Sequence, residues 1–257
     1  MRSRRREMNL VASSMRDRLD TQLVTRSLAE SREKAKRLIL AGAVRVNGQL
    51  AHKPSDLVGD DAALVVEAAE KYASRGGHKL EAALAAFHIS CDNLVCADLG
   101  ASTGGFTDCL LQRGAARVHA IDVGKGQLNW KLRQDPRVVV HDGVNARNLV
   151  VADLGGPVDL VTIDVSFISL TKVLPAAVAA LNAGGALVAL IKPQFEAGKK
   201  LVKKGGVVRD SLVHDAVTKT IHEFATKTLG LTPLGVIPSP LLGPAGNKEF
   251  LIALRKP

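Results

Sequence analysis

The sequence has few cysteines, few aromatic residues and no long apolar run. Of its 257 residues, 3 are cysteines, and aromatic residues make up 3%. Cys91, Cys96 and Cys109 form neither an even disulfide set nor a C-x-x-C pair, so the sequence predicts buried free thiols in a reducing cytoplasm. The longest apolar runs, residues 176–181 and 186–191, are far shorter than the roughly 18 residues that a transmembrane helix needs. These absences exclude a disulfide framework and a membrane-spanning helix.

The chain does have enough apolar mass for a folded core. Hydrophobic residues make up 46% and charged residues 23%, an ordinary globular composition that excludes disorder over the whole chain. At 257 residues the chain is longer than the roughly 100 to 200 residues usual for one domain. We therefore expect one large domain or two unequal domains.

Positive charge is concentrated near the start of the chain. The net charge is +10; residues 1–55 hold 13 Lys and Arg against 5 Asp and Glu, whereas residues 56–257 hold 22 against 20. A small basic module on a near-neutral larger part suggests a nucleic-acid-binding domain attached to a separate active domain. A solubilising charged tail is the alternative. Residues 1–14 are expected to form a loose basic arm, with Met15 as the expected native start.

The first part of the chain predicts two short helices and a small sheet. Apolar residues recur at helical spacing over residues 19–28, and Ser31 can cap a second helix over residues 32–42. An Asn-Gly pair within residues 44–50 is a strong hairpin signal, and residues 62–66 can form a further strand. The residues expected to bind RNA on a basic face are Arg16, Arg18, Arg32, Lys36, Arg37, Arg45 and Lys53.

Helices and apolar strands alternate through the rest of the chain. Residues 72–77 are expected to form a short linker in which two glycines allow a bend. Near-continuous apolar strands separated by helices indicate an α/β fold with a doubly wound, Rossmann-like sheet, preceded by the small α+β domain. The expected strands are residues 94–99, 118–122, 138–141, 158–163, 186–191, 232–237 and 249–254, with one antiparallel strand at the end; the expected helices are residues 78–87, 105–113, 127–134, 170–181 and 211–228.

A glycine-rich turn after the first strand of the large part predicts a cofactor site. Asp98 leads into this turn, and Asp122 ends the next strand, where it is placed for ribose hydroxyls. Ala101 stands where a dinucleotide-binding protein has its second glycine, which disfavours a pyrophosphate site. An acidic residue before the turn suits a cationic amino-acid end, which S-adenosylmethionine has and NAD lacks.

Asp142 ends the third strand, where its carboxylate is expected to take the adenine amino group. The alternative is that these three aspartates only occupy strand ends. The full set expected to bind S-adenosylmethionine is Asp98, Gly100, Ser102, Thr103, Gly104, Gly105, Phe106, Asp122, Val123, Asp142 and Gly143.

Two lysines and two acids fall where such a sheet converges on the cofactor. Asp164 and Lys192 follow the fourth and fifth strands, Lys79 begins the helix before the first strand, and Glu249 opens the last strand. Methyl transfer to a hydroxyl is an in-line displacement in which the hydroxyl loses its proton, and a lysine with a lowered pKa can take that proton. Taken singly, each of these charged residues could instead be a solvated surface group. No metal ligand set is expected.

The N-terminal segment resembles the S-four-type (αL) RNA-binding domain. The resemblance rests on Arg18-Leu-Asp20, Ser31-Arg32, Ala35, Leu38-Ile39, Gly42 and Val44-Arg-Val-Asn-Gly48. In that family the helix pair and hairpin grip structured RNA by shape and phosphate contacts. Residues 1–71 contain no aromatic residue, so base stacking is not the expected mode of binding. The implied domains are residues 15–73 and a methyltransferase domain over residues 74–257.

The remainder resembles FtsJ-like RNA ribose methyltransferases, and the whole chain resembles the TlyA (haemolysin-A-like) family of ribosomal RNA 2′-O-methyltransferases. The resemblance implies Lys79, Asp164, Lys192 and Glu249 as a catalytic tetrad, S-adenosylmethionine as methyl donor and cytidine 2′-hydroxyls of ribosomal RNA or ribosomal subunits as acceptors. It rests on Ser74-Arg-Gly-Gly-His-Lys79-Leu, residues 98–109, Asp122-Val-Gly-Lys-Gly-Gln-Leu128, residues 163–170, Ile191-Lys-Pro-Gln-Phe-Glu196, Gly205-Gly-Val-Val-Arg-Asp210 and Gly246-Asn-Lys-Glu-Phe250.

Four other functions were weighed against this one. A base methyltransferase typically has an Asn-Pro-Pro-aromatic motif after the fourth strand, where this chain has Asp164-Val-Ser-Phe167. A non-catalytic RNA-binding or assembly protein is disfavoured by the intact tetrad, and a dehydrogenase by Ala101 and the basic module. The family name suggests haemolysis, but the sequence has no spanning segment and no basic amphipathic helix with bulky aromatics. We expect a cytoplasmic protein, monomeric and not bound to a membrane.

Overall fold

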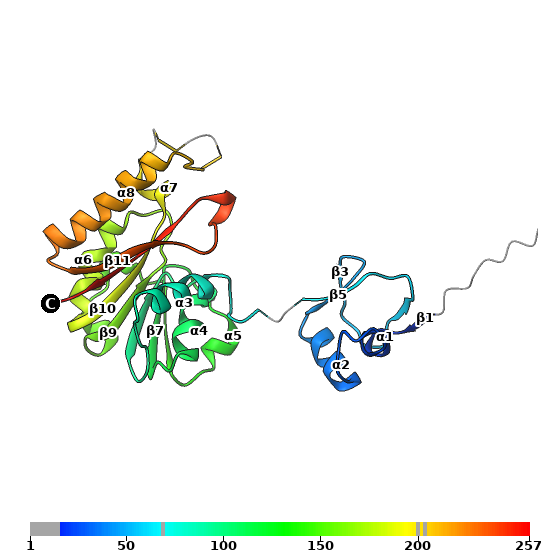
Figure 1. The fold of residues 1–257 in the computed structure, drawn as a ribbon. Coiled ribbons are helices and arrows are strands. Elements are labelled where there is room, and N and C mark those ends of the chain that lie inside the picture. The colour runs from blue at the N-terminus through cyan, green and yellow to red at the C-terminus, as the bar shows by residue number, and fades with distance from the viewer. Residues whose placement is uncertain (1–15, 68–69, 199–200, 203–204) are drawn as a thin grey trace, which may run out of the picture. The chain divides into compact units, whose positions relative to one another are not determined.

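The chain folds into two compact units, Met1–Ala69 and Glu70–Pro257. The structure is a computed structural model that describes residues 16–67, 70–198, 201–202 and 205–257. The predicted basic arm over residues 1–14 and the expected start at Met15 lie outside the described residues. Figure 1 shows each unit with its own helices and strands.

The first unit contains the predicted helix pair and hairpin. Helix α1 is Leu19–Thr25 and helix α2 is Arg32–Leu40, whose N-terminus is capped by the Ser31 side chain as expected. The hairpin joins β2 (Val44–Val46) to β3 (Gln49–Leu50) through Asn47 and Gly48, both at positive φ, and β5 (Leu64–Val66) pairs with β2. A second, two-stranded sheet of β1 (Arg16–Arg18) and β4 (Leu57–Gly59) was not predicted, because three-residue strands carry no readable periodicity.

The second unit is built on a seven-stranded sheet. The strand order is β11-β12-β10-β9-β6-β7-β8, and β12 runs antiparallel to both of its neighbours, which confirms the α/β prediction with one antiparallel strand. The strands are β6 (Val95–Leu99), β7 (Arg117–Asp122), β8 (Val138–Asp142), β9 (Val158–Ile163), β10 (Leu181–Ile191), β11 (Thr232–Pro238) and β12 (Phe250–Arg255).

Helices cover both faces of this sheet (Figure 1). Side chains of α3, α4 and α5 share one apolar cluster, and those of α6 and α8 share another. Because successive strand residues point to opposite faces, Leu187 joins the second cluster and Val188 the first. The helices are α3 (Gly76–Ala86), α4 (Gly105–Gln112), α5 (Trp130–Arg133), α6 (Leu170–Ala180), α7 (Pro193–Glu196) and α8 (Ser211–Glu223), with 3-10 turns at Ala146–Asn148, Val151–Leu154 and Pro244–Gly246.

Three expectations about the second unit need correction. Residues 72–77 are not a free linker: Tyr72 is buried, the Ala73 amide donates to Asp108, and the two glycines begin α3. The helix expected over residues 127–134 is reduced to the four residues of α5, because Asn129 caps it. The helix expected over residues 211–228 ends as α-helix at Glu223 and continues in π form.

The topology brings several loops to one edge of the sheet. The parallel strands β6 and β9 are neighbours at the point where the chain reverses its direction of winding, and ligands of such sheets bind at the carboxyl ends there. Strand β12 enters the sheet at this same edge, because Phe250 pairs with Ile191 at the end of β10. Asp164, Lys192 and Glu249 are therefore carried to adjacent positions.

Candidate functional site

The four predicted catalytic side chains line one cavity of about 300 Å³. They form two ion pairs: Lys192 Nζ lies 2.6 Å from Asp164 Oδ1, and Lys79 Nζ lies 2.6 Å from Glu249 Oε2. Lys79 and Lys192 are each 9% exposed and Glu249 is 2% exposed. Charged groups are seldom buried to this extent unless they are paired, so the arrangement places two lysines in a site that is shielded from water.

Two glycines allow the walls of this cavity to come together. Gly100 has φ +87°, and a Cβ atom there would lie 2.6 Å from the backbone oxygen of Asp164. A Cβ atom at Gly243 would overlap the carboxylate of Glu249. Side chains at either position would displace one of the predicted catalytic residues, Asp164 or Glu249.

The loops after β9 and β10 are joined by side chains that the sequence did not single out. Lys192 Nζ donates to Ser166 Oγ at 2.9 Å. Glu196 accepts from Ser169 Oγ at 2.6 Å and from the Leu170 amide at 2.7 Å, which ties α7 to the start of α6. These contacts hold the loop that carries Lys192 against the loop that carries Asp164. The sequence singled out the neighbouring tetrad residues, but a serine or a glutamate in these two loops does not by itself indicate a role.

A second cavity of about 600 Å³ shares Gly100, Ser102, Asp164 and Ser166 with the first. Asp122 stands in its wall with a fixed orientation, because Oδ2 accepts from the Ser102 amide at 2.8 Å and Oδ1 from the Gly124 amide at 2.7 Å. Its other lining residues include Val123, Gln127, Val144, Asn145, Ala146, Arg147 and Phe167.

Phe167 is another residue whose role the sequence did not indicate. Phe167 is 90% exposed. Its backbone is at φ +63°, a conformation that is unusual for a bulky residue. Its ring lies 5.0 Å from that of Phe195, between centroids. A strained, exposed aromatic residue beside the cavities is a feature expected of a ligand-contacting site.

The structure divides the predicted cofactor residues into two groups. Gly100 and Ser102 line both cavities, Thr103, Gly105 and Phe106 line the first, and Asp122 and Val123 line the second. Asp98, Gly104, Asp142 and Gly143 line neither. Asp142 is paired with Arg133 at 2.6 Å and accepts from the Gly126 amide at 3.2 Å, so contact with a ligand would require this pair to open.

Asp98 lies beneath the glycine-rich turn rather than in its wall. It is fully buried and accepts hydrogen bonds from Thr107 Oγ1 at 2.7 Å and Thr162 Oγ1 at 3.0 Å. Burial raises the pKa of Asp98 to about 7, although both threonine hydroxyls oppose the shift. The carboxyl group therefore joins α4, the helix that follows the turn, to the neighbouring strand β9.

We expect Asp98→Asn to gain stability relative to the wild type as the pH rises. With its folded-state pKa raised to about 7, Asp98 keeps a proton that the unfolded chain releases at its ordinary value. The stabilisation is fully present below about pH 4 and is lost as the pH rises through the folded-state pKa, a change of a few kcal/mol. Asparagine does not titrate.

Urea unfolding of both proteins at pH 4, 6 and 8 measures this effect. Any packing defect of the amide contributes equally at each pH, so the readout is the change in the difference between the two free energies of unfolding. A difference that stays constant from pH 4 to pH 8 would contradict the prediction.

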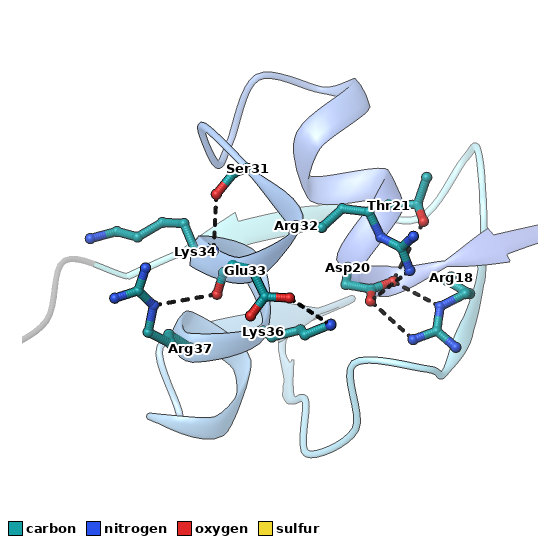
Figure 2. A network of polar contacts seen from close by, with 9 residues as sticks. All are labelled: Arg18, Asp20, Thr21, Ser31, Arg32, Glu33, Lys34, Lys36 and Arg37. Atoms are coloured by element: carbon teal, nitrogen blue, oxygen red, sulfur yellow. Dashed lines mark hydrogen bonds and ion pairs between the residues drawn. The ribbon is translucent and has the colours of Figure 1, made fainter.

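The predicted RNA-binding residues lie on the first unit, where most of them are tied to acids. Figure 2 shows Arg18 and Arg32 converging on Asp20, and Lys36 on Glu33. Arg37 Nε donates to the backbone oxygen of Glu33 at 3.5 Å, Arg45 pairs with Glu67 at 2.6 Å, and Arg16 and Lys53 are exposed.

The charge of this unit is smaller than the sequence count over residues 1–55 suggested. Counted to Ala69, where the unit ends, it holds 13 Lys and Arg against 9 Asp and Glu, a net charge of +4. Asp56, Asp60, Asp61 and Glu67 account for the difference. The larger unit has a net charge of +6, with 22 Lys and Arg against 16 Asp and Glu. The prediction that nearly all the excess charge belongs to the small module is therefore wrong.

Two properties of the described residues bear on other classes of function. No helix among them is long and apolar enough to cross a membrane. Within the same ranges, no group of three His, Cys, Asp or Glu side chains is placed to hold a metal ion. Cys91, Cys96 and Cys109 are buried free thiols.

Known proteins resemble the chain over nearly its whole length. The FtsJ-like methyltransferase family matches residues 72–256, and the S4 domain family matches residues 17–63. The Mycobacterium tuberculosis protein named "16S/23S rRNA (cytidine-2'-O)-methyltransferase TlyA" is 50% identical over 242 residues, covering 93% of this chain and 90% of that protein. "Hemolysin A" of Brachyspira hyodysenteriae is 42% identical over 237 residues, 91% and 98% of the two chains. The solved structure "Putative hemolysin from Streptococcus thermophilus" has a TM-score of 0.72 at 44% identity, covering 95% of this chain and 90% of that one.

Proposed function

The chain belongs to the TlyA family of FtsJ-like methyltransferases, and we propose that it transfers a methyl group from S-adenosylmethionine to a ribose 2′-hydroxyl of ribosomal RNA, with cytidine as the target nucleoside. The observation that carries this proposal is the pair of lysine–carboxylate contacts that line one cavity beside a second, larger one. The first cavity supplies groups for moving a proton, and the second has room and polar groups for a nucleoside.

The residues present fit S-adenosylmethionine. Asp122 offers a carboxylate whose orientation is fixed by two amides, suited to vicinal ribose hydroxyls. Val144, Asn145 and Ala146 line the same cavity for the adenine end, with Asp142 expected to take the adenine amino group if its pair with Arg133 opens. Ser102 and Gly100, shared by both cavities, would hold the amino-acid end, and Asp98 holds the turn beneath it. The cofactor supplies the methyl group as a sulfonium.

Lys192 is assigned as the base. As the 2′-oxygen attacks the methyl carbon, its proton would pass to Nζ of Lys192, which must first have released a proton from its ion pair with Asp164, and the carbon–sulfur bond would break, so charge is conserved. Asp164 and Ser166 orient Nζ through contacts of 2.6 and 2.9 Å. Lys79, held by Glu249, places positive charge near the developing oxyanion.

Mass mapping of ribose methyl groups tests the function directly. Ribosomal RNA from cells with and without the protein is digested and compared, and the purified chain is then given labelled S-adenosylmethionine and either naked RNA or ribosomal subunits. New 2′-O-methylcytidine that depends on the protein is the expected result. Label on a base, or no label with any of these substrates, would reject the proposal.

We expect Asp122→Ala to weaken S-adenosylmethionine binding by about 1 to 3 kcal/mol, the value of a charge-assisted hydrogen bond to the ribose. Asp142→Ala makes the matched comparison, since it also removes a carboxylate from a strand end; its effect should be smaller because Arg133 already occupies that group. Calorimetry measures both. Unchanged affinity in Asp122→Ala would leave that residue a structural role at the strand end.

The partner, the location and the oligomeric state complete the proposal. The substrate is ribosomal RNA or a ribosomal subunit, bound by the S4 domain, whose family matches residues 17–63, and methylated by the unit Glu70–Pro257. Three buried free thiols suit a reducing cytoplasm, where ribosomes are made. All four tetrad side chains come from the unit Glu70–Pro257, and the proposal takes the chain to act as a monomer. The alternatives are a non-catalytic assembly protein, which the two ion pairs of the tetrad disfavour, and a haemolysin, which no feature of the described residues supports.

A further inference from the structure

One buried carboxylate organises the basic face of the first unit. Asp20, in the first turn of α1, is fully buried. It accepts from Arg18 Nε at 3.0 Å and Arg18 Nη2 at 2.9 Å, which is a bidentate contact, and from Arg32 Nη2 at 3.2 Å (Figure 2). The Arg18 hydrogen bonds, with a smaller contribution from Arg32, lower the pKa of Asp20 to about 2, so the group is charged at every working pH.

The backbone fixes where this carboxylate stands. The Asp20 amide donates to the backbone oxygen of Pro54 at 3.0 Å, and the preceding amide, of Leu19, donates to Asp56 at 2.8 Å. Leu19 itself is buried in the core of the unit. Backbone hydrogen bonds and the buried Leu19 thus fix the position of Asp20, and its carboxylate in turn binds the two arginines.

The two arginines remain available at the surface. Their side chains are 41% and 54% exposed. Among the described residues, neither Nη1 of Arg18 nor Nε and Nη1 of Arg32 has a hydrogen-bond partner in the protein. Each guanidinium therefore uses one edge for Asp20 and presents the rest outward, a fork geometry that matches phosphate oxygens.

The other basic residues of the unit are held differently. Lys36 pairs with Glu33 and Arg45 with Glu67, but these acids are 75% and 46% exposed. Exposed ion pairs contribute little to stability and do not hold a long side chain in one conformation. Among the ion pairs in the described part of this unit, those with Asp20 are the ones whose acid is buried.

We propose that Asp20 is a positioning residue for RNA binding, which holds Arg18 and Arg32 as a preorganised pair for neighbouring phosphates of structured ribosomal RNA. The inference rests on the proposed function, which it deepens. A free arginine loses rotamer entropy when it binds, and a fixed one does not. The unit has a net charge of only +4, and Asp20 itself lowers that charge. Geometry rather than net charge is then what Asp20 contributes.

The sign of one substitution separates these two effects. Asp20→Asn keeps the side-chain shape and adds one positive charge to the basic face. If charge alone governs RNA binding, the variant should bind more tightly and with a steeper salt dependence. If positioning governs it, the variant should bind more weakly although its salt dependence does not fall. Glu30→Gln makes the matched control, because it adds the same charge at an exposed position of the same unit.

The test uses the full chain and its methylation of ribosomal RNA over a range of salt concentrations. We expect Asp20→Asn to raise KM for RNA on the order of tenfold, as two freed side chains imply, with kcat and S-adenosylmethionine affinity unchanged. Glu30→Gln should leave KM unchanged or lower it. A double variant, Arg18→Lys with Arg32→Lys, conserves charge and retains Asp20, and it should raise KM similarly because lysine lacks the fork.

Several results would overturn the inference. A lower KM in Asp20→Asn would show that charge dominates, and a wild-type KM in the double lysine variant would show that the fork is unnecessary. Unfolding of the small unit would raise KM too, but it would flatten the salt dependence; a flattened response together with a wild-type KM in the double variant would assign Asp20 to stability alone. If the wild-type chain itself methylates no RNA, the proposed function fails, which is a separate outcome.

Discussion

Replacing Lys192 with arginine is expected to abolish methyl transfer, with a loss on the order of 10³-fold or more in kcat, while both substrates still bind. Arginine keeps the positive charge and can still pair with Asp164, but it is protonated at every accessible pH and cannot take a proton. Lys192→Ala should be equally inactive. Both variants lack an amine that can accept a proton, so inactivity of both is the result that the assignment of Lys192 as the base requires.

Ser166→Ala gives an independent check. It should lower kcat only modestly, because it removes a contact that orients Nζ and not the proton acceptor. Near wild-type turnover in Lys192→Arg would reject the assignment and leave Lys192 with a role in charge stabilisation or positioning.

Three members of the tetrad could be predicted from the topology because each adjoins the end of a strand that the fold makes adjacent to the others, whereas Lys79 lies in α3. Apolar runs defined β9 and β10, and the residues after them, Asp164 and Lys192, had to meet at one edge. Glu249 needed one further step, since only an antiparallel β12 starts at that edge. The order of the strands thus carried most of the prediction of the site.

The order of the strands did not predict the direction in which side chains at the strand ends point. Asp98 is the fourth residue of β6, and its side chain is buried between the sheet and α4, where Thr107 and Thr162 donate hydrogen bonds to it. Asp142 does end β8, but Arg133 from α5 lies close enough to pair with it. A strand end fixes the position of the backbone, whereas tertiary neighbours decide where a carboxylate points. Ser166 and Glu196 were missed for the same reason.

The net charge of the first unit was overestimated because the count stopped at residue 55, before the end of the unit at Ala69. The window over residues 1–55 ended before four acids that fold with the module, two of which bond to its own side chains: Asp60 to Gln22 and Glu67 to Arg45. Three-residue β4 gave no periodic signal that would have extended the window. The helix pair and hairpin, by contrast, followed from a cap at Ser31 and an Asn-Gly turn that act locally.

Removing residues 1–69 should separate the two binding functions of the chain. Every residue that lines either cavity lies in Glu70–Pro257, and both apolar clusters of the sheet are built from that unit alone. The shortened chain should therefore bind S-adenosylmethionine as the full chain does. Its KM for ribosomal RNA should rise by about 100-fold or more, because several phosphate contacts are lost together.

The salt dependence distinguishes this loss from a general decrease in charge. The deletion removes a net charge of only +4 and leaves +6 on the remaining unit, so nonspecific attraction to RNA should persist. If the small unit makes the phosphate contacts, the slope of log KM against log salt should fall by about one for each contact removed. The full chain with Arg18 and Arg32 both changed to alanine should lie between the two. An unchanged KM after deletion would show that the larger unit recognises the RNA by itself, and the S4 domain would then have to act at a step other than substrate binding.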